Sequence, residues 1–308
     1  MGQTLSEPAK EKLTFSDHDD RILYASSSMQ GWRISMEDAH TTQLKLLDKK
    51  EYSYFGVFDG HSGQKVAKYS EENLHVRIAN DSKFETDIIS AIKNGFLGTD
   101  DDMKNNPSLQ NDPSGCTAVI AIVTPDSEIY VGNAGDSRAV LSEDGVAIPM
   151  SDDHKPSNPD ESDRITEAGG YIEFGRVNGN LSLSRALGDF EFKQNTKLGA
   201  EKQIVTAYPD VKKHGIKIES TEFLVLACDG IWDCLKSQDV VSFIRKNIAE
   251  HNDLKRACED LMERCLSETG DGSIGTDNMT IIIIGFLYNK TETEWYKWMT
   301  SRYGEIEI

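Results

Sequence analysis

The stretch Tyr54-Phe55-Gly56-Val57-Phe58-Asp59-Gly60-His61 is an apolar run that ends on Asp-Gly. A second apolar run, residues 223–228, ends in the same way on Asp229-Gly230, and a third, residues 279–287, begins soon after Asp277. Short apolar runs bounded by Gly and Asp are typical of buried strands. The sequence therefore predicts that carboxylates lie at the ends of core strands.

Carboxylates at converging strand ends would repel one another and lose water, unless a cation neutralised them. One Asp-Gly is weak support for a ligand, because it is a common turn dipeptide. Here Asp-Gly follows two apolar runs, Asp277 precedes a third run, and Asp136 lies between two predicted strands. Together these positions favour a metal cluster. Gly60 adds to this interpretation, because a residue without a side chain lets its own carbonyl approach a cation. All of these donors are oxygen atoms, which favours Mg²⁺ or Mn²⁺ over zinc.

The segment 32–40 lies upstream of these runs and has two interpretations. In a helix, Arg33 and Glu37 would form an exposed pair one turn apart, with little functional interest. In a strand they would share one face, about 13 Å apart, and both side chains could reach a common pocket. The alternation of polar and apolar residues favours the strand, although Asp38 would then point to the apolar side unless the strand ends there.

His61 comes directly after the first Asp-Gly. A single histidine in a chain with seven is usually structural or exposed, and we interpret the histidines at 18, 75, 214 and 251 in that way. His61 differs, because its neighbours would hold it at the rim of the carboxylate cluster. An imidazole there can donate a proton to a leaving group near neutral pH.

The composition narrows the class of protein. At 308 residues the chain can bury a substantial core, and its formal net charge is −19. That charge disfavours nucleic-acid backbones and anionic membranes as partners, because both are polyanions. The five cysteines are scattered, which argues against a disulfide framework or a zinc site and favours the reducing cytosol or nucleus. No run of the sequence is long enough to span a bilayer.

The first six residues, Met1-Gly2-Gln3-Thr4-Leu5-Ser6, match the N-myristoylation pattern, in which Gly2 carries the acyl chain. Short patterns of this kind also match by chance. One acyl chain followed by an acidic segment would give only weak, reversible membrane association.

Predicted elements of one kind come in groups along the chain. We expect helices over 64–79, 85–103, 159–168, 237–250 and 254–267, and strands over 52–58, 117–123, 128–131, 138–141, 223–228 and 279–287. The three strands between 117 and 141 suggest an antiparallel meander. This grouping predicts an α+β fold of antiparallel sheets flanked by helices, not alternating βαβ units. We expect a mobile N-terminal arm (1–20), one domain (21–290) and a C-terminal helical or tail segment (291–308).

Eight short motifs follow one another along nearly the whole chain. They are Arg33-Ile34-Ser35-Met36-Glu37-Asp38, Val57-Phe58-Asp59-Gly60-His61-Ser62-Gly63, Gly115-Cys116-Thr117-Ala118, Gly135-Asp136-Ser137-Arg138, Asp153-His154-Lys155-Pro156, Leu183-Ser184-Arg185-Ala186-Leu187-Gly188-Asp189, Cys228-Asp229-Gly230 and Gly275-Thr276-Asp277-Asn278. Together, and in this order, they resemble the motifs of the metal-dependent Ser/Thr protein phosphatases of type 2C, and the start of the chain is similar to the eukaryotic alpha/beta-like branch. The resemblance implies a central antiparallel β-sandwich flanked on both faces by α-helices, with a binuclear metal site at one end.

The resemblance also implies a role for each matching residue. Asp59 would bridge two Mg²⁺ or Mn²⁺ ions. The other ligands would be Asp229 and Asp277 for one ion, Glu37 and the Gly60 carbonyl for the second, Asp38 through bound water, and Asp136 with Asp229 for a weaker third ion. The segment 152–189 would correspond to a mobile flap and its supports.

The implied reaction is hydrolysis of phosphoserine and phosphothreonine in proteins such as kinases of signalling pathways. A water activated by two metal ions would attack phosphorus, Arg33 would bind the phosphoryl oxygens, and His61 would protonate the leaving alkoxide. No Cys-x5-Arg run, the mark of a cysteine nucleophile, is present. We expect a monomer.

Two alternatives belong to other classes. The first is a phosphoprotein-binding scaffold with the same fold and little turnover. The presence of Asp59, Asp229 and Asp277 disfavours it. The second is another two-metal hydrolase such as a nuclease, which the acidic balance and the lack of a basic stripe disfavour.

Overall fold

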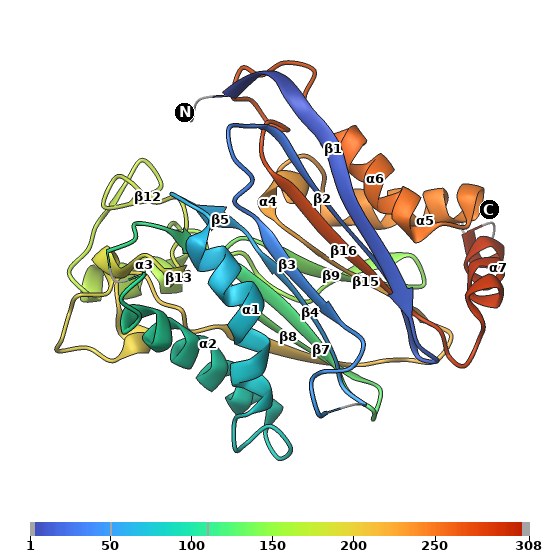
Figure 1. Cartoon of the computed structure of the whole chain (residues 1–308), viewed down its shortest axis with the longest axis horizontal. Helices are drawn as coiled ribbons and strands as arrows, with labels where there is room; N and C mark the ends of the chain where they lie inside the picture. The colour runs from blue at the N-terminus through green and yellow to red at the C-terminus, as the bar shows by residue number, and fades with distance from the viewer. Residues whose placement is uncertain (1–3, 50, 110, 304–308) are drawn as a thin grey trace. The chain divides into compact units, whose positions relative to one another are not determined.

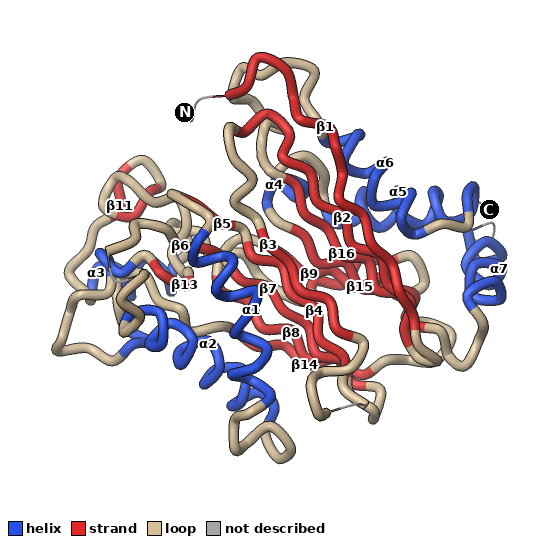
Figure 2. The backbone as a smooth tube through the Cα atoms, viewed as in Figure 1, coloured by secondary structure: helices blue, strands red, loops and turns tan. Residues whose placement is uncertain are grey.

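The computed structural model describes residues 4–49, 51–109 and 111–303. The chain divides into two compact units. The first unit comprises residues 1–36, 139–150 and 214–308, and the second comprises residues 37–138 and 151–213. Each unit has its own β-sheet with helices packed against it, as Figure 1 and Figure 2 show. Among the described residues, no helix combines the length and the apolar content that crossing a bilayer needs.

The first unit is built on a six-stranded sheet. In order across the sheet, its strands are β1 (Thr4–His18), β2 (Ile22–Arg33), β16 (Met279–Phe286), β15 (Thr221–Ala227), β9 (Arg138–Glu143) and β10 (Val146–Pro149). β1, β2, β16 and β15 pair antiparallel in succession, and so do β9 and β10. Every residue of β15 and β16 is buried. The two uninterrupted apolar runs of the sequence therefore form the centre of this sheet.

Helices α5 (Ser237–His251) and α6 (Leu254–Cys265) share one apolar core with this sheet. The buried residues of α6 recur three and four positions apart, the spacing that turns one helix face toward a core. The short helix α4 (Asp229–Trp232) contacts β15 and β16, and α7 (Glu292–Tyr303) packs against α5 and buries Trp295. The helices predicted over 237–250 and 254–267 are thus confirmed.

The N-terminal segment differs from the prediction of a mobile arm. Residues 4–18 form β1, which pairs with β2 from Leu13 opposite Ser28 to His18 opposite Leu23. Backbone pairing with β2 holds this edge strand in the sheet, and even the apolar side chain of Leu13 is 59% exposed. The side chains of β1 therefore do not alternate between buried and exposed, and the sequence lacks the pattern that predicts a strand. Residues 1–3, with the predicted acylation site Gly2, lie outside the described residues.

The second unit is built on a five-stranded sheet. In order, its strands are β14 (Asp210–Gly215), β8 (Glu128–Ala134), β7 (Ala118–Val123), β4 (Ser53–Phe58) and β3 (Ala39–Gln43). Helices α1 (Lys65–Ala79) and α2 (Ile88–Lys104) bury Leu74, Ile78 and Phe96 in one core with this sheet. Asp87 is the N-cap of α2, and its carboxylate accepts the Ser90 N–H of the first turn at 3.1 Å.

A smaller sheet of two-residue strands belongs to the same unit. Its order is β13 (Leu187–Gly188), β6 (Gly115–Cys116) and β5 (Gly60–His61). Residues 151–213 also contain α3 (Pro159–Glu167), the hairpin of β11 (Ile172–Glu173) and β12 (Arg176–Val177), and the 3-10 turns η1 (Phe190–Phe192) and η2 (Ala200–Lys202). This small sheet brings three distant segments of the sequence together.

The predicted three-stranded meander is wrong in its last strand. β7 and β8 pair antiparallel, as expected. β9, however, lies in the sheet of the first unit, where it pairs with β10. The short connection, in which Gly135 has a φ of +125°, carries the chain out of the second sheet. Sequence spacing predicts that a strand follows, but not which sheet it joins.

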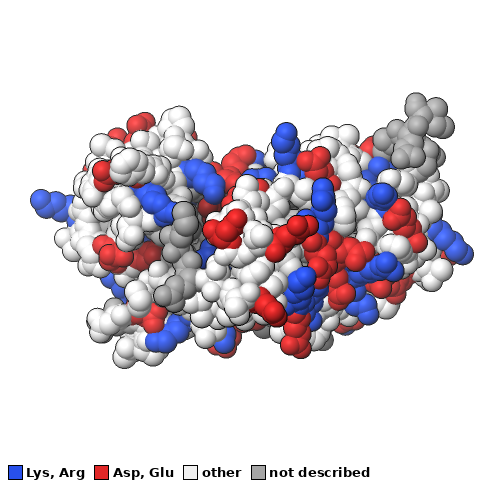
Figure 3. All heavy atoms as spheres, turned by 90° about the horizontal axis from the view of Figure 1, so that it is seen from above, with Lys and Arg blue, Asp and Glu red and all other residues white. Residues whose placement is uncertain are grey.

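Acidic and basic side chains are mixed on the surface. On the face drawn in Figure 3, basic and acidic side chains are interspersed. The formal net charge of −19 is therefore not a uniform acidic field on that face. Mixed charge of this kind keeps a surface soluble and still offers local sites for ions of either sign.

A buried carboxylate organises the segment around α3. Glu161 is 2% exposed, and its two oxygens accept hydrogen bonds from Arg164 at 2.7 Å and Arg185 at 2.6 Å. Ser184 donates a third bond at 2.5 Å. Burial alone would raise the pKa of Glu161, but the Arg185 hydrogen bond and the two positive charges lower that pKa to about 2.

We expect Glu161→Gln to lower the free energy of unfolding by about 3 kcal/mol at pH 7. The mostly buried Arg164 guanidinium loses its counter-charge, and Arg185 keeps only its exposed partner Asp210, at 2.9 Å. A carboxyl with a depressed pKa stabilises the folded state above its unfolded pKa and loses that effect as the pH falls through its folded pKa. The difference between the two proteins should therefore be constant above about pH 5 and shrink toward about pH 2.

Denaturant unfolding at several pH values measures this difference. Asp160→Asn is the matched control, because Asp160 is the exposed neighbour of Glu161 in α3, and it should change stability by less than about 0.5 kcal/mol. Equal stability of Glu161→Gln and the wild type at pH 7 would show that the cluster does not stabilise the fold.

Candidate active site

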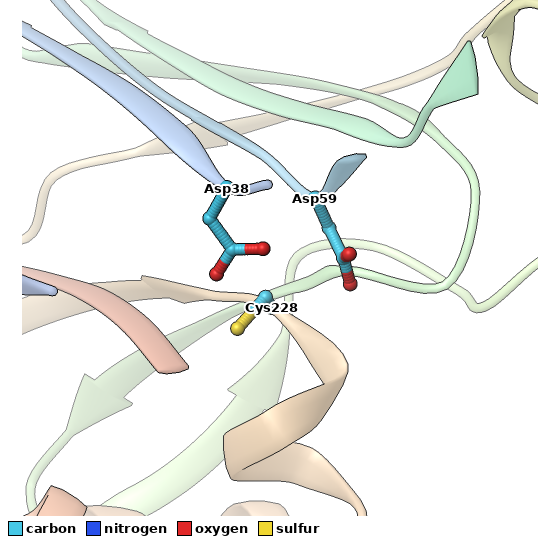
Figure 4. A group of neighbouring side chains, drawn as sticks. All are labelled: Asp38, Asp59 and Cys228. Carbon is cyan, nitrogen blue, oxygen red and sulfur yellow. The ribbon is translucent and has the colours of Figure 1, made fainter. Parts of the chain in front are cut away.

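Two aspartates lie at one end of the second unit's sheet. Asp38 precedes β3 and Asp59 follows β4, and the antiparallel pairing places Ala39 opposite Phe58. Carboxylate oxygens of the two aspartates lie within 4.8 Å of each other. Figure 4 shows both side chains extending to the same side of the strand ends. Because close carboxylates repel, this end of the sheet is suited to a cation.

Glu37 and Gly60 meet next to this aspartate pair. The Glu37 carbonyl oxygen lies so near the Gly60 backbone that a Cβ at position 60 would overlap it. Only glycine permits this approach. The Glu37 carboxylate accepts the Gly63 N–H at 3.1 Å. The second unit thus gathers Glu37, Asp38, Asp59 and Gly60, four of the residues that the sequence singled out.

Asp136 lies after β8 in the same unit and is only 3% exposed. The Lys155 ammonium binds its carboxylate at 2.5 Å. The motif Asp153-His154-Lys155-Pro156 does not by itself indicate this contact. A lysine at this distance supplies the positive charge that a buried carboxylate needs, so the chain itself neutralises Asp136.

The first unit brings three other predicted residues to one end of its sheet. β15 runs antiparallel to β16, with Ala227 opposite Ile281, so Asp229 after β15 and Asp277 before β16 lie at the same end. Arg33 is the last residue of β2, on the other side of β16, and its guanidinium binds the Asp277 carboxylate at 2.5 Å. Arg33 therefore contacts a predicted metal ligand, and its position in the sequence does not indicate this contact.

Cys228 helps to fix this end of the first unit. It is fully buried, and it is labelled in Figure 4. Its N–H donates to the Thr280 carbonyl at 3.2 Å, and its Sγ accepts the Thr280 N–H at 3.1 Å. These bonds tie the residue before Asp229 to the start of β16. The spacing of the five cysteines in the sequence does not indicate this contact.

His61 contacts the carboxylate of Asp189, a residue predicted only as part of the flap segment 152–189. Its Nε2 lies 2.7 Å from an Asp189 carboxylate oxygen. Burial lowers the pKa of His61, but the hydrogen bond to Asp189 and the charges of Asp189, Asp136 and Glu37 outweigh burial and raise it. The ring is therefore more readily protonated than an ordinary histidine, as a proton donor requires.

The strand predicted over 32–40 is wrong beyond Arg33. β2 ends at Arg33, β3 begins at Ala39, and the connection between them is irregular. Ile34 is 55% exposed, so the alternation of polar and apolar residues does not reflect a buried face. The strand end also removes the difficulty with Asp38, which follows an irregular segment and is not forced toward an apolar side.

The donors at these strand ends fit a hard divalent cation. They are carboxylates and backbone carbonyls, the oxygen ligands that Mg²⁺ and Mn²⁺ prefer. The close approach of Asp38 to Asp59 is the observation that supports a cation in the second unit. In the first unit, the guanidinium of Arg33 already supplies one positive charge to Asp277.

Comparison with known proteins gives the family. Residues 22–274 match the family model described as Protein phosphatase 2C. The chain is 52% identical over 312 residues to Protein phosphatase 2C homolog 2 of Hypocrea jecorina, across 98% of this chain and 71% of that protein. It is 50% identical over 313 residues to Protein phosphatase 2C homolog 2 of Schizosaccharomyces pombe, across 100% of this chain and 84% of that protein.

A solved structure of a phosphatase from Toxoplasma gondii has a TM-score of 0.78 at 24% identity, covering 91% of this chain and 96% of that one. This likeness confirms the predicted α+β fold of antiparallel sheets flanked by helices. The chain belongs to the protein phosphatase 2C family, the type 2C Ser/Thr phosphatases. It is thus a protein phosphatase, a hydrolase whose substrates are phosphoproteins, in a family that depends on metal ions.

Proposed function

We propose that this protein hydrolyses phosphoserine and phosphothreonine in proteins by direct attack of water. The observation that carries the proposal is that each sheet brings its predicted carboxylates to one end. These are Asp38 and Asp59 in the second unit, and Asp229 and Asp277 in the first. Acidic side chains gathered in this way on both sheets favour turnover over the alternative of a phosphoprotein-binding scaffold.

In this proposal two Mg²⁺ or Mn²⁺ ions would be held by Glu37, Asp38, Asp59, the Gly60 carbonyl, Asp229 and Asp277, and a third ion would bind more weakly at Asp136. Cations bound there would supply an activated water and offset the charge of the phosphoryl group. The contact between Lys155 and Asp136 supports weak ion binding at the third position, because an ion at Asp136 must compete with the Lys155 ammonium group.

The chain's own residues bind the substrate and move the proton. Arg33 holds phosphoryl oxygens; a guanidinium carries five donors, so it can bind Asp277 and phosphate together. His61 protonates the serine or threonine alkoxide as it leaves. The Asp189 carboxylate at 2.7 Å supports this role, because it favours the ring form that carries the proton to be donated.

We also propose that the protein works as a monomer in the cytosol or the nucleus. Within the described residues no disulfide joins any of the five cysteines, which fits a reducing compartment. Acylation at Gly2 stays a prediction, because that residue lies outside the described part of the chain.

Arg33→Ala tests the proposed function through phosphate binding. The wild type should release phosphate from a phosphothreonine peptide over many turnovers, whereas a scaffold would bind the peptide and release none. In the variant we expect KM to rise about 10- to 100-fold, the equivalent of a lost charged hydrogen bond. Mn²⁺ affinity should be unchanged or higher, because a cation that competes for Asp277 is removed.

Steady-state kinetics and calorimetric Mn²⁺ titration measure the two quantities. Arg77→Ala is the matched control, since Arg77 pairs with Asp102 at 2.9 Å and is half exposed. It should leave both quantities unchanged. A large loss of Mn²⁺ affinity in Arg33→Ala would mean that Arg33 orders Asp277 and does not bind phosphate.

A further inference from the structure

The small sheet places His61 and Asp189 on either side of one glycine. β6 lies between β5 and β13, with His61 opposite Gly115 on one side and Gly188 opposite Gly115 on the other. Asp189 follows Gly188 directly. A Cβ at position 115 would overlap the Asp189 carboxylate and crowd the His61 ring. Glycine at this position therefore leaves the space in which the two side chains meet.

Asp189 is held in a conformation that aims it at the ring. Its φ of 49° lies in the left-handed region, which aspartate and asparagine tolerate better than most residues. Its N–H donates to the Ser114 carbonyl at 3.3 Å. The side chain is 5% exposed, and its carboxylate reaches His61 Nε2 at 2.7 Å. The carboxylate is thus buried, fixed at its backbone and directed at His61.

A buried ion pair anchors the turn that carries Asp189. Asp100 of α2 accepts the Gly188 N–H at 2.8 Å, and both its oxygens accept from the Lys193 ammonium at 2.8 Å. Lys193 also donates to the Ala186 carbonyl at 2.8 Å. Asp100 and Lys193 are only 9% and 7% exposed. Asp100 therefore ties the chain on both sides of Asp189 to a rigid helix.

We propose that Asp189 is a positioning residue that orients the His61 imidazole for proton donation, and that the Asp100–Lys193 pair holds Asp189 in place. The inference rests on the role of His61 in the proposed function. A general acid must lie within hydrogen-bond reach of the leaving group and keep its orientation, and a buried, anchored carboxylate supplies that constraint.

Asp189→Asn removes the charge but keeps the shape and tolerates the left-handed backbone. In single-turnover assays we expect it to slow hydrolysis of a phosphothreonine peptide about 100-fold, the cost of a misplaced catalytic group. Hydrolysis of nitrophenyl phosphate should slow far less, because nitrophenolate leaves without a proton. In a His61→Ala background, Asp189→Asn should have no further effect on the peptide. Equal losses on both substrates, or additive losses with His61→Ala, would overturn the inference.

The chain offers a matched control in another histidine–carboxylate pair. His214 Nε2 lies 2.7 Å from Glu143, the same distance as in the proposed pair. Glu143→Gln should leave both rates unchanged. Asp100→Asn should reproduce the substrate-dependent loss to a smaller extent. If Asp189→Asn does not fold, Asp189→Gly removes the same carboxylate from a backbone that glycine also tolerates.

A readout that does not depend on turnover separates this inference from the proposed function. Ring ¹⁵N spectra should show the His61 signals changed in Asp189→Asn and unchanged in Glu143→Gln. Unchanged His61 signals in Asp189→Asn would overturn the positioning role even in an active phosphatase. If instead His61→Ala alone loses activity equally on both substrates, the acid role proposed for His61 fails, whatever the spectra show.

Discussion

Asp59→Asn is expected to lower kcat/KM for a phosphothreonine peptide by more than about 100-fold, since even residues that only support a metal ligand contribute roughly 10- to 100-fold. Asp59 is proposed to bind both cations and lies within 4.8 Å of Asp38 at the carboxylate oxygens. Replacing its charge by an amide removes much of the attraction for a divalent ion at that end of the sheet. Mn²⁺ affinity should therefore fall together with activity.

Activity assays and calorimetric titration with Mn²⁺ measure both effects. Asp126→Asn is the matched control, because Asp126 is an exposed aspartate in the turn between β7 and β8. It should leave activity and Mn²⁺ affinity at wild-type values. If Asp59→Asn binds Mn²⁺ as tightly as the wild type, Asp59 is not a metal ligand.

His61→Ala is expected to slow hydrolysis of phosphothreonine peptides by roughly 10²- to 10⁴-fold, the usual contribution of general acid catalysis. The reason is that a threonine alkoxide is a poor leaving group without a proton. Nitrophenyl phosphate should be affected much less, because nitrophenolate departs unaided. Mn²⁺ affinity should stay close to that of the wild type.

Single-turnover rates are the appropriate measurement, since slow product release would mask a change in the chemical step. His214→Ala is the control, because that histidine pairs with Glu143 at the same 2.7 Å that separates His61 from Asp189. It should change neither rate. Equal losses on both substrates in His61→Ala would return His61 to a structural role.

The strand ends that carry the acidic residues could be predicted from the sequence. The apolar runs that precede Asp59 and Asp229 form β4 and β15, and the run that follows Asp277 forms β16. Every residue of these three strands is buried. Long apolar runs leave few other structures open to the chain, because their burial is the dominant favourable term in folding. The helices could likewise be predicted from the spacing of apolar residues along the sequence.

Contacts decided by backbone pairing could not be predicted in this way. β1 is an edge strand whose side chains are largely exposed, so its sequence reads as a polar arm. The strand predicted through Glu37 ends at Arg33, because the chain turns from β2 of one sheet to β3 of another. β9 likewise changes sheet after Asp136. The periodicity and composition of a sequence indicate which face of a strand is buried, but not which neighbouring strand it pairs with.

Contacts between charged residues that are distant in the sequence could not be predicted either. Arg33 and Asp277, Lys155 and Asp136, and His61 and Asp189 meet only in the folded chain. Each of these residues stands in one of the eight motifs, yet a motif gives residue types and spacing and does not show which side chains pair. The proposed role of Asp189 follows from the pairing of the three small strands and from Gly115, and the motifs that contain these residues do not indicate that they pair.

The central claim is that divalent cations held by these carboxylates are required for hydrolysis of phosphoserine and phosphothreonine. The most direct test is phosphate release from a phosphothreonine peptide after chelation and removal of metal ions, with and without added Mn²⁺ or Mg²⁺. The proposed function predicts no release from the metal-free protein and full recovery when either ion is restored. Undiminished release from protein verified to be free of metal would contradict it.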